Sequence, residues 1–171
     1  ADLHEMAGEW KELTEVLEKQ VVATAEPEAR IPIFKRLGRI WGEKLGRERN
    51  SLESWQKVLE IDPQDVDALR AIVENYRSAG AWEELSEALR RLIGVAQLGE
   101  SGVAQPELQD LYSQLGELEG ETLMRTPEAI EAWREVLEID AHDFRALAAL
   151  EKLFMQEARW EDAVDILERR A

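Results

Sequence analysis

The sequence contains no cysteine and only two histidines, His4 and His142. Without cysteine the chain can form neither a disulfide nor a thiolate metal site. Two histidines far apart in the chain support neither a histidine-based catalytic triad nor a multi-histidine metal site. Stability must therefore come from packing, for which a content of 44% hydrophobic residues is sufficient.

Long apolar runs are also missing. The longest weakly charged stretch, LIGVAQLG at 92–99, is too short to cross a bilayer. The opening ADLHEMAGEW has neither a basic region nor an apolar region of the kind found in targeting peptides. We expect no membrane partner; the sequence does not fix the compartment, although the cytoplasm is favoured.

Basic residues are few, with 21 Lys and Arg against 37 Asp and Glu, which gives a net charge of −16. Such a charge repels phosphate backbones and anionic lipids, so nucleic acid is not expected as a partner. The segment Arg30 to Arg49 is the exception, because it holds seven basic and two acidic residues, a local charge of 7 − 2 = +5.

Signals of catalysis and of β-strands are weak. No alternating β-branched run predicts a strand, so no glycine-rich phosphate loop can follow one. Adjacent acids such as Glu83 and Glu84 are explained by the dipole at a helix start. We predict no catalytic residue, no cofactor and no metal, and therefore no enzyme.

What the sequence does contain is an internal repeat. WQKVLEID at 55–62 returns as WREVLEID at 133–140, and an ungapped alignment of 37–93 with 115–171 has 21 identities in 57 pairs. A partial third copy lies at the front, where AGEWKELTEVLEKQ resembles AGAWEELSEALRRL with Trp10 at the place of Trp82. The period of the repeat is 78 residues, which we interpret as two helical hairpins, because hairpins that stack side by side typically repeat about every 30 to 50 residues.

Apolar residues recur at helical spacing throughout the repeat. Helix starts are predicted at Asn50, with Glu53 three residues later, and at Thr126, which precedes a proline; Gly80 predicts a helix stop. We predict about nine helices, joined by connections that make neighbours antiparallel. Their ranges are 3–20, 29–46, 51–62, 66–79, 82–96, 106–123, 127–139, 143–157 and 160–170.

These residues resemble the tetratricopeptide repeat, a helix-turn-helix unit of about 34 residues. VLEIDP at 58–63 is similar to the end of such a repeat, Trp55 fills its late aromatic position, and Leu37-Gly38 its first-helix pair. The stretch from Leu37 to Pro63 is one residue longer than the family pattern. The resemblance implies an all-α fold, an α-solenoid of antiparallel helical hairpins.

We expect a single repeat array, with a half repeat at 1–28, a first unit at 29–105 and a second at 106–171. Because stacking surface would be exposed on the terminal helices, we expect a segment of a longer array and possible self-association through those helices.

The resemblance implies that the first helices of the hairpins line a groove that binds another protein or a peptide. Most candidate partner-binding residues are placed by the family spacing, and Arg36 and Trp41 are added because they belong to the basic segment or lie close to its charges. The candidates are Lys35, Arg36, Arg39, Trp41, Arg70, Glu74, Arg77, Glu117, Glu121 and Lys152. A non-enzymatic protein-interaction scaffold is the leading interpretation. The alternatives are a structural spacer or self-assembly arm and, against the net charge, an RNA-binding relative.

Overall fold

In a computed structural model the chain is all-α, and its two compact units comprise residues 1–80 and 81–171. The structure describes residues 2–98 and 102–170, and the side chains in the first range from residue 8 onward, so the side chain of His4 lies outside them. Within the described ranges there are nine α-helices and no strand, which confirms the predicted fold class. None of these helices combines the length and the apolar composition needed to cross a bilayer.

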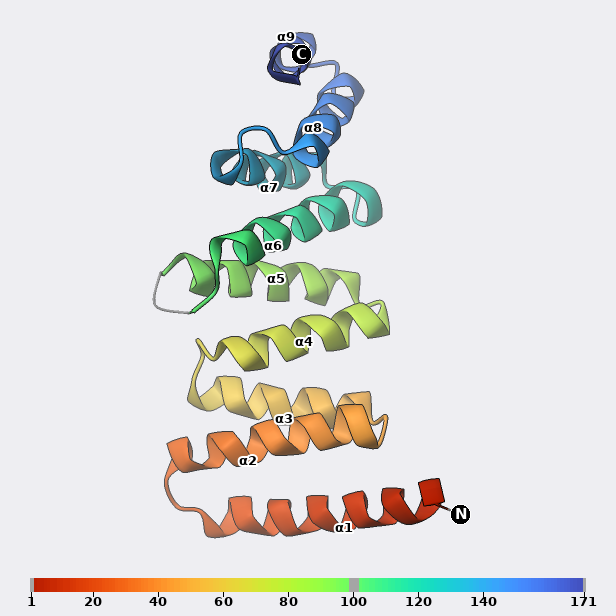
Figure 1. Ribbon diagram of the computed structural model, residues 1–171, viewed down its shortest axis with the longest axis vertical. Helices are drawn as coiled ribbons and strands as arrows, with labels where there is room; N and C mark the ends of the chain where they lie inside the picture. The colour runs from red at the N-terminus through yellow and green to blue at the C-terminus, as the bar shows by residue number, and fades with distance from the viewer. Residues whose placement is uncertain (1, 99–101, 171) are drawn as a thin grey trace. The chain divides into compact units, whose positions relative to one another are not determined.

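The N-terminal unit contains α1 (Asp2–Ala23), α2 (Pro27–Arg39), α3 (Glu48–Ile61) and α4 (Val66–Ala79), with successive helices running in opposite directions (Figure 1). The C-terminal unit contains α5 (Trp82–Gln97), α6 (Gln105–Glu117), α7 (Thr126–Ile139), α8 (Phe144–Gln156) and α9 (Trp160–Arg170). Each helix packs an apolar stripe on its neighbours within the unit, and polar side chains cover the other faces.

Two predicted helices, 29–46 and 106–123, each end in a turn of π-helix. The π turns are η1 (Ile40–Lys44) and η2 (Leu118–Thr122). Their wider hydrogen bonds run from Leu45 N to Ile40 O over 3.1 Å and from Leu123 N to Leu118 O over 2.9 Å. A π turn accommodates one extra residue, which explains physically why the repeat is one residue longer than the family pattern.

The predicted helix starts at Asn50 and Thr126 are wrong by three residues and by one residue, respectively. The residues that precede α3 and α7 are Arg47 and Arg125, and neither provides a side-chain cap. The aspartates before α4 and α8 do cap: Asp65 accepts from Ala68 N and Asp143 from Ala146 N, each over 2.9 Å. The helix stop at Gly80 is confirmed, because this glycine has a φ of +67°.

A tryptophan lies flat against a glycine in each unit. A methyl group built on Gly38 would be 2.6 Å from Cε2 of Trp55, and one built on Gly116 would be 2.7 Å from Cε2 of Trp133. Both tryptophans are buried. The Leu-Gly pairs and the repeated tryptophans of the sequence are therefore two halves of the same contact, which holds α2 to α3 and α6 to α7.

Candidate functional site

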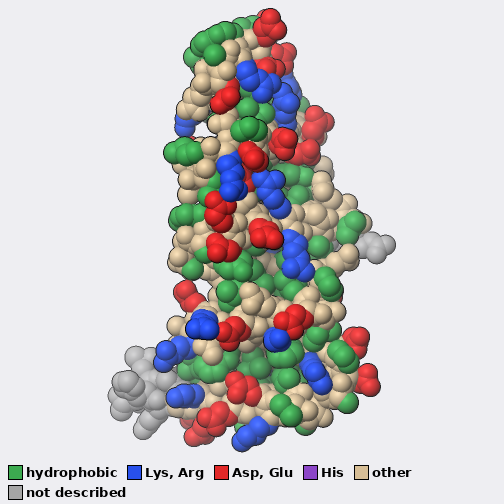
Figure 2. Space-filling view, turned by 180° about the vertical axis from the view of Figure 1, so that it is seen from behind, with side chains coloured by type: hydrophobic (Ala, Val, Ile, Leu, Met, Phe, Trp, Pro, Cys, Tyr) green, Lys and Arg blue, Asp and Glu red, His purple; other side chains and the backbone are tan. Residues whose placement is uncertain are grey.

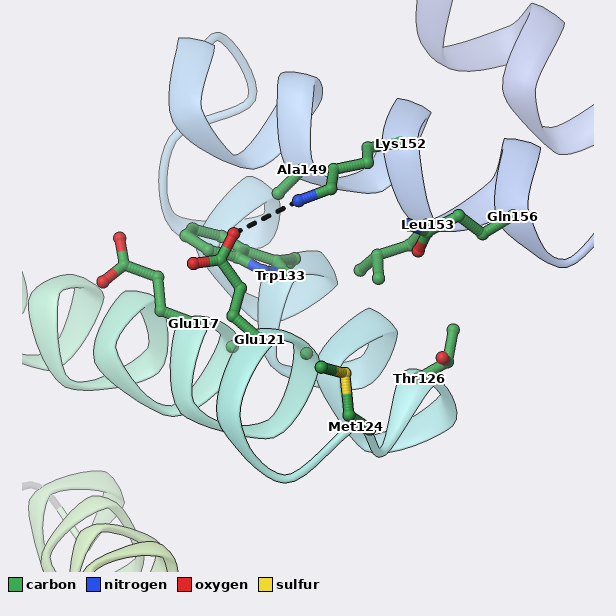
Figure 3. A pocket seen from close by; sticks show the side chains of 11 residues that line it. Glu117, Glu121, Met124, Thr126, Trp133, Ala149, Lys152, Leu153 and Gln156 are labelled. Atoms are coloured by element: carbon green, nitrogen blue, oxygen red, sulfur yellow. Dashed lines mark hydrogen bonds and ion pairs between the residues drawn. The ribbon is translucent and has the colours of Figure 1, made fainter. Parts of the chain in front are cut away.

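The C-terminal unit contains a pocket of about 280 Å³ between α6, η2, α7 and α8. Gly116 and Gly120 have no side chain and leave room for the pocket on the side of α6 and η2. Ala149 has a small side chain and leaves room on the side of α8. Trp133 and Leu153 give it an apolar lining, and the other lining residues are Glu117, Glu121, Met124, Thr126, Lys152 and Gln156. Figure 3 shows these side chains around the opening.

Three predicted partner-binding residues meet at this pocket. Lys152 donates to Glu121 over 3.3 Å, and in Figure 3 the two side chains face each other across the opening. Glu117 is exposed, and no cation within the described part of the chain pairs with it. The rim therefore carries two carboxylates for one ammonium group, a net charge of −1 beside an apolar interior.

Met124 contributes an unusual feature to the same rim. It is exposed and has a φ of +55°, a left-handed conformation that is unfavourable for a side chain of this kind. In the N-terminal unit the equivalent residue, 78 positions earlier, is Gly46 with a φ of +60°. The turn geometry is thus kept while a flexible apolar side chain is placed beside the pocket, at a cost on the order of 1 kcal/mol.

The same place in the N-terminal unit has reversed charges at two of its three charged positions. Arg39 and Glu74 stand at the positions of Glu117 and Lys152, whereas Glu43 matches Glu121. Glu74 pairs with Arg77 one turn further along α4. Arg39 is exposed on α2 together with Arg36, and Arg70 is half-buried on α4. The predicted residues of this unit therefore lie on α2, η1 and α4.

Lys35 is engaged within the protein. Its ammonium group lies 2.7 Å from Asp65 and 2.9 Å from Asp67, so it ties α2 to the start of α4. Burial would lower the pKa of Lys35, but the hydrogen bonds and charges of the two aspartates outweigh burial and raise it. The hydrogen bond from Lys35 is also the main reason why the pKa of Asp67 is lowered. Lys35 is thus less available to a partner than its charge suggests.

Trp41 is half-buried and packs against the apolar cluster that includes Leu17, Leu37 and Ile40. Its equivalent in the C-terminal unit, Glu119, has no exposed surface. These two residues occupy the second position of the π turns, which aims both of them at the preceding helix of their own unit.

Glu119 forms a polar network that sequence reasoning did not find. Its Oε1 accepts hydrogen bonds from the Ser86 hydroxyl and, over 2.8 Å, from Arg90 Nη2, both on α5. Its Oε2 has no hydrogen-bond partner in the described part of the chain, and Arg125 Nη1 lies 3.6 Å away. A hydrogen bond with Glu83, followed by the charges of nearby glutamates, raises the pKa of Arg125. The signal available in the sequence was the change from Trp41 to Glu119 between two conserved pairs of the repeat, Leu37-Gly38 with Leu115-Gly116 and Gly42-Glu43 with Gly120-Glu121.

No group of three or more potential metal ligands with suitable geometry occurs among the residues that the structure describes. His142 is exposed in the turn before α8. Acidic and basic side chains are intermingled on the face of each unit that Figure 2 displays, without a one-sign patch.

Comparison with known proteins gives a result for the fold. No family model and no curated protein matches the chain by sequence. Among solved structures, it is similar to MamA, with a TM-score of 0.61 and 17% identity over 95% of this chain and 87% of that one. It is similar to a kinesin light chain with TPR-like repeats from Podosopora anserina, with a TM-score of 0.57 and 18% identity over 99% and 92% of the two chains.

A third similar structure is YrrB, described as a TPR protein with an unusual peptide-binding site. Its TM-score is 0.58, with 14% identity over 92% of this chain and 74% of that one. At such low identities the similarity concerns the fold alone. Together with the hairpins, the Leu-Gly and tryptophan contacts and the repeat in the sequence, it shows that this chain is a helical-repeat solenoid of the tetratricopeptide-repeat type.

Proposed function

We propose that the protein is a non-enzymatic scaffold that binds a partner protein through an extended segment, and that the pocket between α6, η2, α7 and α8 is a binding site for it. The observation that carries the proposal is the composition of this pocket. An apolar interior of about 280 Å³ is bordered by Met124 and by Glu117, a carboxylate with no cation beside it in the described structure. Small cavities with few polar groups at the rim suit single side chains of a ligand.

The pocket chemistry favours a partner segment that carries an apolar side chain next to a lysine or arginine. The apolar side chain would contact Leu153, Met124 and the ring of Trp133. The cation would meet Glu117 directly and Glu121 in competition with Lys152. Because the hairpins hold the pocket open in advance, little reordering of the scaffold opposes binding.

Fluorescence anisotropy with two labelled peptides of about 12 residues tests this site. One peptide has lysines flanking a leucine, and in the other the lysines are glutamates. We expect the basic peptide to bind, and Glu117→Arg to weaken its binding at least tenfold, which corresponds to about 1.4 kcal/mol. Glu131→Arg, the same change on the exposed surface of α7 outside the pocket, is the matched control.

A further variant removes Lys152, which competes with the ligand for Glu121. Lys152→Ala frees Glu121, so the basic peptide should bind more tightly. If Glu117→Arg and Glu131→Arg weaken binding equally, the attraction is only the general charge of the protein, and the pocket proposal is wrong.

A second candidate contact is the basic surface of α2 in the N-terminal unit, formed by Arg36 and Arg39. Both are exposed, and we propose that they meet an acidic partner segment. Charge reversal of Arg36 and Arg39 to Glu should abolish binding of the acidic peptide without changing helicity. Lys35 is excluded from this variant because its pairing with Asp65 and Asp67 stabilises the unit itself. Unchanged binding would exclude this surface.

A further inference from the structure

Helix α9 buries one apolar face and leaves another uncovered. Ala163 and Ile166 are each 4% exposed and lie on the side of α9 that packs on α8. Trp160, Val164 and Leu167 are 60%, 53% and 45% exposed. Apolar side chains are visible on the surface of this helix in Figure 2. We call Val164 and Leu167 the α9 face and leave Trp160 out of it, because its equivalent Trp82 is 42% exposed although α6 packs on α5.

The repeat shows what covers the same face elsewhere in this protein. Leu167 corresponds to Leu89 of α5 and to Leu17 of α1, which are only 1% and 3% exposed. In the C-terminal unit α6 and η2 pack on α5, and in the N-terminal unit α2 and η1 pack on α1. In both cases the cover is the first helix of a hairpin together with its π turn.

The two covers differ in chemistry. The π turn η2 places the buried carboxylate of Glu119 against α5, where the Ser86 hydroxyl and the Arg90 guanidinium donate hydrogen bonds to it. Against α1 the π turn η1 places Trp41 in an apolar cluster with Leu17. The α1 residue at the place of Ser86 is Thr14, whose hydroxyl donates to Lys11 O of its own helix over 2.7 Å, so that no donor is left for the neighbour.

The α9 face resembles the apolar face of α1 and not the polar face of α5. Val164 stands at the place of Thr14 and Ser86, and it has the shape of threonine without a hydroxyl. Glu168 stands where α1 has Glu18 and α5 has Arg90. A carboxylate brought to this face would find neither the hydroxyl nor the guanidinium that Glu119 uses, and it would be repelled by Glu168.

We propose that the α9 face docks a helical hairpin of a partner protein, and that the first helix of this hairpin carries tryptophan or another large apolar residue at the place of Trp41. A hairpin with glutamate at this place, like Glu119, should not dock on the α9 face. The pair of residues at 164 and 168 thus selects which hairpin stacks. This inference does not depend on the pocket between α6 and α8.

An extended chain tests the selection, because a tether raises the effective concentration of a weakly binding hairpin. The probe is the hairpin sequence of residues 22–62, appended after Ala171, which stands at the place of Val21, with either tryptophan or glutamate at its copy of Trp41. Each version is combined with the unchanged α9 or with Val164→Ser and Glu168→Arg, which give α9 the residues of α5. Urea unfolding followed by circular dichroism reports how well the appended hairpin is docked.

On the unchanged α9, the tryptophan hairpin should raise the urea midpoint and the glutamate hairpin should not, with a difference of at least roughly tenfold in the docking equilibrium. With Val164→Ser and Glu168→Arg the preference should reverse. Equal behaviour of the two hairpins, or an appended hairpin that never docks, would overturn the proposal. So would self-association of the unextended chain in sedimentation that Val164→Asp abolishes, because a second copy would then be the occupant.

Discussion

Replacing Gly116 by alanine should destabilise the C-terminal unit, although alanine is the better helix former. A methyl group at this position would lie 2.7 Å from Cε2 and Nε1 of Trp133 and 2.9 Å from Cδ1. Carbon atoms in contact are normally 3.5–4.0 Å apart. Trp133 is only 4% exposed, so its ring can move away only by displacing its neighbours.

The magnitude follows from two opposing effects. Overpacking of a buried site costs about 1–3 kcal/mol. The change from glycine to alanine inside a helix contributes about 1 kcal/mol in the opposite direction. The difference between the two effects is a loss of about 0–2 kcal/mol. Because the methyl group would overlap three ring atoms, we expect Gly116→Ala to fall in the upper half of this range, a loss of about 1–2 kcal/mol, which in a unit of this size corresponds to a fall in Tm of roughly 4–16 °C.

Gly94 provides the matched control. It lies in α5 of the same unit, and nothing within 4 Å would meet a methyl group built on it. Gly94→Ala should therefore stabilise the unit by about 0.5–1 kcal/mol. Urea unfolding, followed by circular dichroism and tryptophan fluorescence, measures both variants under the same conditions.

The reasoning can be checked further with the partner of the contact. Trp133→Leu removes the ring, so the combination with Gly116→Ala should cost less than the sum of the two single changes. Gly38→Ala, facing Trp55, should repeat the effect in the N-terminal unit. If Gly116→Ala proves as stable as Gly94→Ala, the glycine is not required by the tryptophan and the explanation of the Leu-Gly pair is refuted.

Three further predictions concern single features of the fold. Ala158 has a φ of +54° after α8, so Ala158→Gly should raise the free energy of unfolding by about 0.5–1 kcal/mol in urea titrations, and an unchanged value would mean that this turn carries no strain. Glu119→Ala should lower it by about 1–3 kcal/mol because buried hydrogen bonds are lost, whereas a neutral result would show that the network is not needed for packing. The pKa of Asp67 is lowered in the folded protein, so its pair with Lys35 should stabilise the fold, by up to about 1 kcal/mol, above pH 3.8. This contribution should be lost as the pH falls through the folded pKa of Asp67. The difference in the free energy of unfolding between the wild type and Lys35→Met should therefore shrink over the same pH range.

The helical fold was predictable because every element repeats a strong local signal. The apolar spacing of 3.6 residues, the tryptophans at 55 and 133 and the stop at Gly80 depend on neighbouring residues only. The π turns were visible only as one surplus residue, since a hydrogen-bond shift of one position leaves the apolar stripe almost unchanged. The helix starts at Arg47 and Arg125 were missed because no side chain caps them.

The candidate site was predictable in position but not in detail. Family spacing placed Glu117, Glu121 and Lys152 on facing helices, and the structure brings them to one pocket. That Lys35 is held by Asp65 depends on contacts between helices 30 residues apart, which no local pattern encodes. Whether these residues bind a partner remains a prediction, which the peptide experiments address.

The exchange of charges between Arg39 and Glu74 in one repeat and Glu117 and Lys152 in the other leaves the sum of each rim at −1, counting Glu43 and Glu121, but moves the charges to different helices. A cation placed beside Glu117 would meet the like charge of Arg39 at the equivalent place of the N-terminal unit. The two copies of the repeat are therefore not interchangeable, and one cationic segment would not fit both in the same orientation.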